Sequence, residues 1–123
     1  MVKARRLQLR RGDTGVIPFQ AITVESQPID LTGSTVRFAA KQSLADSDAD
    51  ALISKVSPTG IILNSDPTTG IGEVIVDPED TEGLLAVVYN LTYNIQVTSP
   101  SGQVTTVQEG PLIIVPDATI THP

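Results

Sequence analysis

The sequence predicts a single all-β domain, an antiparallel β-sandwich of about seven to nine strands with one or two short helical turns. Three observations predict this fold. Thr, Val and Ile supply 39 of the 123 residues, and β-branched side chains pack better on a pleated sheet than in a helix. Apolar and polar residues alternate in several runs, as in strands with one buried face. Nine Gly and nine Pro, spread along the chain, divide these runs into short strands.

The clearest alternation covers residues 88–98. One face of this segment carries the apolar and aromatic side chains Tyr89, Leu91, Tyr93, Ile95 and Val97. Residues 34–41 and 72–77 repeat the pattern. Residues 16–24 are apolar on both faces and include Pro18, which cannot donate a ladder hydrogen bond, so we expect an edge strand or a bent strand there.

Turn signals separate the predicted strands. Residues 66–70 and 99–102 combine Pro with Gly and are typical of hairpin connections, so residues 92–98 and 103–108 are expected to pair. Residues 77–84 predict one helical turn, with Asp77 as the N-cap and Pro78 at the first helical position. Residues 45–52 are the candidate for a second turn.

The charge of the chain is divided unevenly. The net charge is −6, yet five of the eight basic residues lie in the first eleven positions: Lys3, Arg5, Arg6, Arg10 and Arg11. We therefore divide the chain into a basic N-terminal arm (1–11), a sandwich domain (12–118) and a C-terminal tail (119–123). The arm is a candidate for docking onto a negative partner, which leaves open a neighbouring copy, another protein or nucleic acid, or it is a solvated terminus. The acidic body and the four Phe and Tyr residues argue against nucleic acid.

Residues 112–115 read Leu-Ile-Ile-Val and break the alternation. A strand that is apolar on both faces is either covered on both sides or meets another subunit. We favour a contact between subunits and name Ile113 and Ile114 as partner-binding candidates. A homo-oligomer within an assembly is the expected state.

The sequence offers no catalytic, cofactor-binding or metal-binding residues, so we expect no enzyme and no cofactor. Cysteine is absent, and His122 is the only histidine, so neither a Ser-His-Asp nor a Cys-His arrangement can be built. No apolar run approaches the roughly 20 residues needed to cross a bilayer, and the basic start is not followed by the apolar stretch of a secretory signal. No membrane partner is expected.

Asp46, Asp48 and Asp50 alternate as in the first half of a calcium-binding loop. The later positions of that loop would be Ala51 instead of Gly and Ser57 instead of Glu. Because those ligands are missing, we interpret the segment as a solvated acidic loop.

Four segments resemble the immunoglobulin-like virion domains of tailed bacteriophages, most closely the N-terminal domain of phage baseplate upper proteins. They are LRRGDT (9–14), IDLTGSTVRF (29–38), YNIQVT with SGQV (93–98 and 101–104) and GPLIIVPD (110–117). The resemblance implies an immunoglobulin-like sandwich that is a non-catalytic part of a virion, assembled in the host bacterial cytoplasm. It also implies other virion proteins, and copies of the chain itself, as partners.

Three functions follow as hypotheses. The first is a structural protein of the tail tip, baseplate or receptor-binding apparatus, assembling through the basic arm and strand edges. The second is a capsid cement, decoration or head-fibre protein that clamps major capsid subunits. It stays open because the sequence ends at Pro123, without the stalk that follows the domain in baseplate upper proteins. The third is a free carbohydrate- or receptor-binding module.

Overall fold

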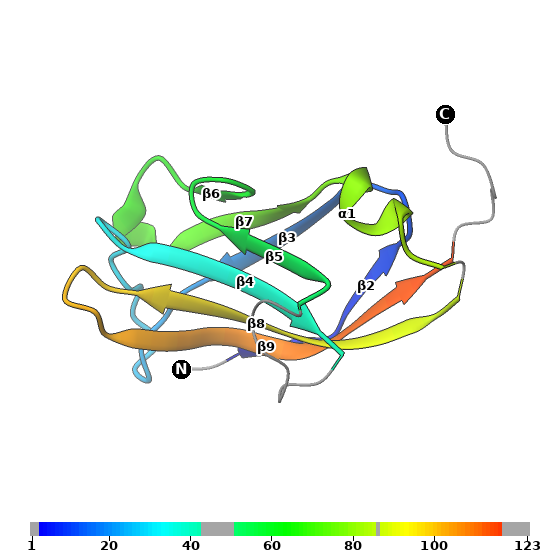
Figure 1. Cartoon of the computed structure of the whole chain (residues 1–123). Helices are drawn as coiled ribbons and strands as arrows, with labels where there is room; N and C mark the ends of the chain where they lie inside the picture. The colour runs from blue at the N-terminus through cyan, green and yellow to red at the C-terminus, as the bar shows by residue number, and fades with distance from the viewer. Residues whose placement is uncertain (1–2, 43–50, 86, 117–123) are drawn as a thin grey trace.

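The computed structural model describes residues 3–42, 51–85 and 87–116, which form two facing β-sheets (Figure 1). The strands are β1 (Lys3–Ala4), β2 (Leu7–Arg10), β3 (Gly15–Gln20), β4 (Thr35–Lys41), β5 (Ile53–Val56), β6 (Ile61–Leu63), β7 (Ile71–Val76), β8 (Tyr89–Thr98) and β9 (Val104–Val115). A single-turn helix, α1 (Pro78–Glu82), and a 3₁₀ turn, Pro67–Thr69, lie in the connections. The predicted all-β sandwich is confirmed.

The strand order is that of an immunoglobulin-like sandwich. The smaller sheet has the order β3-β7-β6, and the larger sheet has the order β5-β4-β8-β9 with β1 and β2 both on the outer side of β9. Immunoglobulin-like domains place strands B, E and D in one sheet and strands C, F and G in the other. Here β3, β7 and β6 take the places of B, E and D, and β4, β8 and β9 take those of C, F and G. The predicted hairpin is the β8–β9 pair, in which Thr98 lies opposite Val104.

The sandwich is antiparallel except at one edge of the larger sheet. β1 and β2 run parallel to β9, with Leu7 opposite Leu112 and Arg10 opposite Val115. Alternation specifies which side chains face inward but not the direction of the neighbouring strand, so it could not reveal this pairing. The larger sheet is therefore mixed.

The core lies between the two sheets and consists of the inward side chains of their strands. Leu91, Tyr93, Ile95 and Val97 of β8 are buried as predicted, and the ring of Tyr93 stacks on Phe38 with centroids 5.8 Å apart. β3 is an edge strand, as its proline predicts.

The helical turn predicted after Asp77 is α1. Pro78 is its first residue, and the carboxylate of Asp80 accepts a hydrogen bond from the Asp77 backbone N–H at 2.7 Å. The Lys55 ammonium of β5 lies 2.7 Å from Asp80 and 3.5 Å from Asp77, which ties the edge of the larger sheet to the helix. Most of the second predicted turn, at residues 45–52, lies outside the described residues, as do the tail at 119–123 and Asp46, Asp48 and Asp50.

Candidate assembly surface

The predicted basic arm lies along the edge of the larger sheet. β1 pairs with Gln108 and Glu109 of β9, and β2 pairs with residues 112–115. Leu7 and Leu9 pack against the core. We call residues 3–14, which comprise β1, β2 and the following turn, the arm edge.

Between β1 and β2 the arm is held by a buried hydrogen-bond chain. The Tyr93 hydroxyl donates to the Arg5 carbonyl oxygen at 2.7 Å and accepts from the Gln108 side-chain amide at 3.0 Å. Gln108 is only 2% exposed, so this bond provides a partner for an amide that water cannot reach. Burial raises the pKa of the Tyr93 hydroxyl above its ordinary value, although the bond from Gln108 opposes the shift.

Gly110 allows the arm to approach β9 at this point. A Cβ atom on Gly110 would collide with the carbonyl group of Arg5, and the backbone of Gly110 has a φ of 155°. Glycine is favoured where two backbones pass this closely. The Arg5 N–H also donates to the Glu109 carbonyl oxygen at 3.0 Å, so the arm is bonded on both sides of Gly110.

The five predicted basic residues have different surroundings. The Arg11 guanidinium donates to the carbonyl oxygens of Glu82, at 2.6 Å, and Leu84, at 3.3 Å, and so fastens the turn to the end of α1. Arg5, Arg6 and Arg10 are exposed, and Arg10 donates to the Pro116 carbonyl oxygen at 3.3 Å. Lys3 lies in β1 beside Gln108. Exposed arginines on a backbone that is fixed by sheet pairing form the candidate docking surface.

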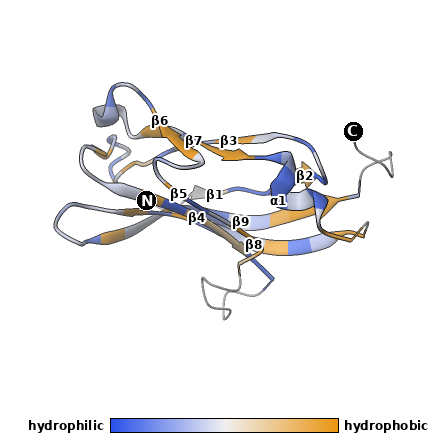
Figure 2. Ribbon diagram, turned by 45° about the horizontal axis from the view of Figure 1, so that its top comes forward, coloured by the Kyte–Doolittle hydropathy of each residue, from blue (hydrophilic) through white to orange (hydrophobic). Residues whose placement is uncertain are grey.

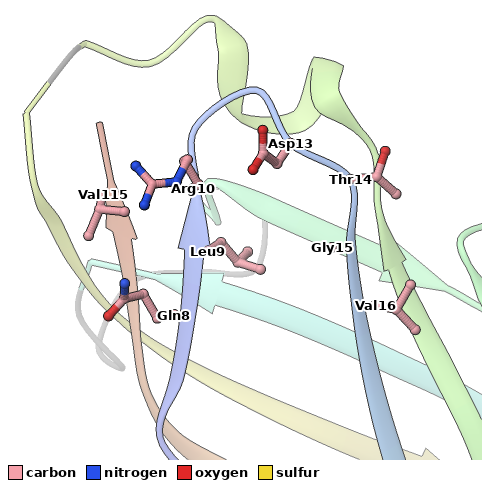
Figure 3. Close-up of a pocket in the computed structure, with 8 residues that line it drawn as sticks. All are labelled: Gln8, Leu9, Arg10, Asp13, Thr14, Gly15, Val16 and Val115. Atoms are coloured by element: carbon pink, nitrogen blue, oxygen red, sulfur yellow. The ribbon is translucent and has the colours of Figure 1, made fainter. Parts of the chain in front are cut away.

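An open pocket of about 360 Å³ lies beside the arm edge, between β2 and β3 (Figure 3). Gln8, Leu9 and Arg10 line one side of it and Asp13–Val16 the other, with Val115 next to β2. Leu9 points across toward Gly15, where a Cβ atom would come within 2.7 Å of the leucine methyl group. The pocket lies between two sheet edges, β2 of the larger sheet and β3 of the smaller one, and its lining includes one cation, Arg10, and one carboxylate, Asp13.

The structure separates the two isoleucines that we named together. Ile114 points into the core and is 1% exposed, so it cannot meet a partner without unfolding. Ile113 is half-buried on the outer face of the sheet, between Gln8 of β2 and Asn90 of β8. Only Ile113 remains a candidate for contact.

Apolar side chains that the sequence did not single out surround this end of β9. Leu85, Val87 and Val88 are exposed in the segment between α1 and β8, and Val88 directly precedes Tyr89, which lies opposite Ile114. Val115 lies beside Arg10 on the outer face. We call this surface the end patch: Arg10, Leu85, Val87, Val88, Ile113 and Val115.

Within the described residues, no group of His, Cys, Asp and Glu is arranged to hold a metal ion. His122 lies outside them. In the same part of the chain no helix is long and apolar enough to cross a membrane.

No family model matches the chain, and no curated protein matches it. Among solved structures it is similar to the N-terminal domain of ORF48 of phage TP901-1, at 10% identity over 94% of each chain with a TM-score of 0.46. It also shows a weaker similarity to AggA, the major subunit of aggregative adherence fimbriae type I from Escherichia coli. That match has 14% identity over 89% of each chain and a TM-score of 0.31.

Proposed function

We propose that this chain is a non-catalytic structural protein of a tailed-bacteriophage virion. It assembles through the arm edge into the tail tip, the baseplate or the receptor-binding apparatus. Its partners are other virion proteins and copies of itself.

The observation that carries this proposal is the rigid presentation of basic side chains. Arg5, Arg6 and Arg10 are exposed on a backbone that is paired with β9 and anchored by the Tyr93–Arg5 hydrogen bond. Residues 12–123 carry three basic and fourteen acidic residues, so a second copy offers this edge an oppositely charged surface. Charge complementarity of this kind orients encounters and fixes register more than it adds affinity.

The mechanism is passive. A sandwich of two facing sheets holds its strand edges in fixed positions, so little conformational freedom is lost when these edges bind. Because the symmetry of a virion repeats the same contact, many weak contacts act together and stabilise the assembly. The four segments that resemble phage virion domains are consistent with such a role.

Immunogold labelling of purified phage particles, produced from a genome that carries this gene, tests the proposal. We expect the protein in the particles, with label at one end of the tail. Label over the head would indicate capsid decoration instead of a tail role. Complete absence of the protein from purified particles would overturn the virion assignment.

A further inference from the structure

The outer face of the smaller sheet is largely apolar, and most of its side chains are exposed within the part of the chain that the structure describes. Its side chains alternate with the buried ones of β3, β6 and β7: Val16, Pro18, Gln20, Ile62, Ile71, Glu73 and Ile75. Ile62 is 57% exposed and Val16 is 51% exposed. The ribbon of this sheet is largely coloured as hydrophobic because its strands are apolar on both sides (Figure 2). We call this set the small-sheet face.

Glu73 is the charged residue of the small-sheet face. It lies opposite Pro18 on one side and Ile62 on the other. Among the residues that the structure describes, no cation is paired with it. A hollow of about 340 Å³ opens beside it, lined in part by Pro18, Ile62 and Ile71. The small-sheet face is therefore a hollowed, mainly apolar surface that carries one negative charge.

The end patch has the opposite character and lies on the other sheet. It combines exposed Leu85 (70%) and Val88 (55%) with half-buried Ile113 and Val115, and its one charged residue is Arg10. Leu85 and Val88 are exposed apolar side chains on a connecting segment, whereas the small-sheet face has a hollow lined by apolar residues. The two surfaces therefore carry opposite charges, and each offers apolar side chains to the other.

We propose that the small-sheet face of one copy binds the end patch of the next, with Glu73 opposite Arg10 and the side chains of Leu85 and Val88 in the hollow. A two-fold contact of either surface with itself would bring Glu73 against Glu73 or Arg10 against Arg10, and such like charges disfavour the complex. The contact is consequently head to tail. Repeated head-to-tail contacts form a ring if the rotation between copies closes and a filament if it does not. This inference deepens the proposed function and rests on it for the expectation that copies associate.

Charge-reversal variants test the contact by sedimentation velocity over a concentration series. We expect the wild type to self-associate, and Glu73→Arg or Arg10→Glu alone to weaken association by roughly tenfold or more, because each places like charges together. The double variant, Glu73→Arg with Arg10→Glu, restores the opposite charges and should recover association. An equimolar mixture of the two single variants should recover it as well, because every contact in an alternating assembly then pairs unlike charges.

Glu25→Arg and Arg37→Glu are the matched controls, because they make the same charge changes at exposed residues outside both surfaces. Circular dichroism verifies that each variant is folded. The inference is overturned if the wild type stays monomeric up to about 1 mM, if the single variants associate like the wild type, or if a folded double variant does not recover. A monomeric protein that is nevertheless found in particles contradicts this contact alone, whereas absence from particles contradicts the proposed function itself.

Discussion

Tyr93 connects the core to the arm edge. Its ring stacks on Phe38 inside the sandwich, and its hydroxyl holds the Arg5 carbonyl oxygen and the Gln108 amide. The position of the arginines therefore depends on a residue that lies under the sheet. The sequence predicted Tyr93 as a core residue from its place in the alternation, but the alternation carries no information about the partners of its hydroxyl.

Tyr93→Phe should leave the Arg5 carbonyl and the Gln108 amide without their partner in a buried site. Such a loss costs about 1–3 kcal/mol of the free energy of unfolding, which urea denaturation can measure. Tyr89→Phe is the matched control, because the Tyr89 hydroxyl accepts a bond from the Leu85 N–H in an exposed position. Equal stabilities of the two variants would contradict the anchoring role of Tyr93.

The surroundings of Lys55 predict that the folded protein loses stability at alkaline pH. Burial alone would lower the pKa of its ammonium, but the hydrogen bond with Asp80 and the charges of Asp80 and Asp77 raise it above the ordinary value of 10.5. The folded state thus binds this proton more tightly than the unfolded chain does. The stabilisation is fully present below pH 10.5 and is lost as the pH rises through the higher pKa of the folded state.

The measurement is the free energy of unfolding of the wild type and of Lys55→Met from neutral into alkaline pH. Comparing the two proteins removes the contribution of Tyr93, whose raised pKa weakens the fold in the same direction. We expect the advantage of the wild type to shrink only in the alkaline range. A constant difference across the series would show that the ion pair with Asp77 and Asp80 does not act as described.

At the scale of the element, β9 joins the hairpin to the arm edge. Ile113 and Ile114 are neighbours in sequence but face opposite sides of it. Ile114→Ala removes buried methyl groups and should cost about 2–5 kcal/mol of stability. Ile113→Ala lies on the outer face and should cost about 1 kcal/mol or less. Thermal or urea unfolding distinguishes the two, and equal losses would mean that the inward face of β9 has been assigned wrongly.

Element type was predictable where the local pattern is strong. The five inward residues of β8 and the Asp77-Pro78 start of α1 are visible in the sequence because alternation and capping are local signals. The direction of β1 and β2 was not predictable, since strand pairing depends on residues about a hundred positions apart. The burial of both Val107 and Gln108 was also missed, because the register shift opposite Ile95 and Gln96 inserts one extra residue, Val107, into β9 and breaks its two-residue period.

At the scale of the whole molecule, the arm is part of the sandwich. Deleting residues 1–11 would remove β1 and β2 and expose the edge of β9 beside Leu112 and Ile114. Failure of such a variant to dock would not distinguish loss of the docking residues from loss of the fold. The cluster of basic residues located the arm in the sequence. It could not show that the Arg11 side chain binds carbonyl oxygens of the same chain, whereas Arg5 and Arg6 are exposed. That distinction needs the tertiary placement of α1.

Incorporation of arginine variants into particles tests the central claim, that the arm edge docks the protein within a virion. The test variant is Arg5→Glu with Arg6→Glu, and the control is Arg37→Glu, which reverses an exposed arginine on β4 away from the arm edge. The amount of each folded variant in purified particles is measured by quantitative mass spectrometry. The account predicts that the arm variant is strongly depleted from particles while Arg37→Glu is incorporated like the wild type. Incorporation of the arm variant at the wild-type level would contradict it.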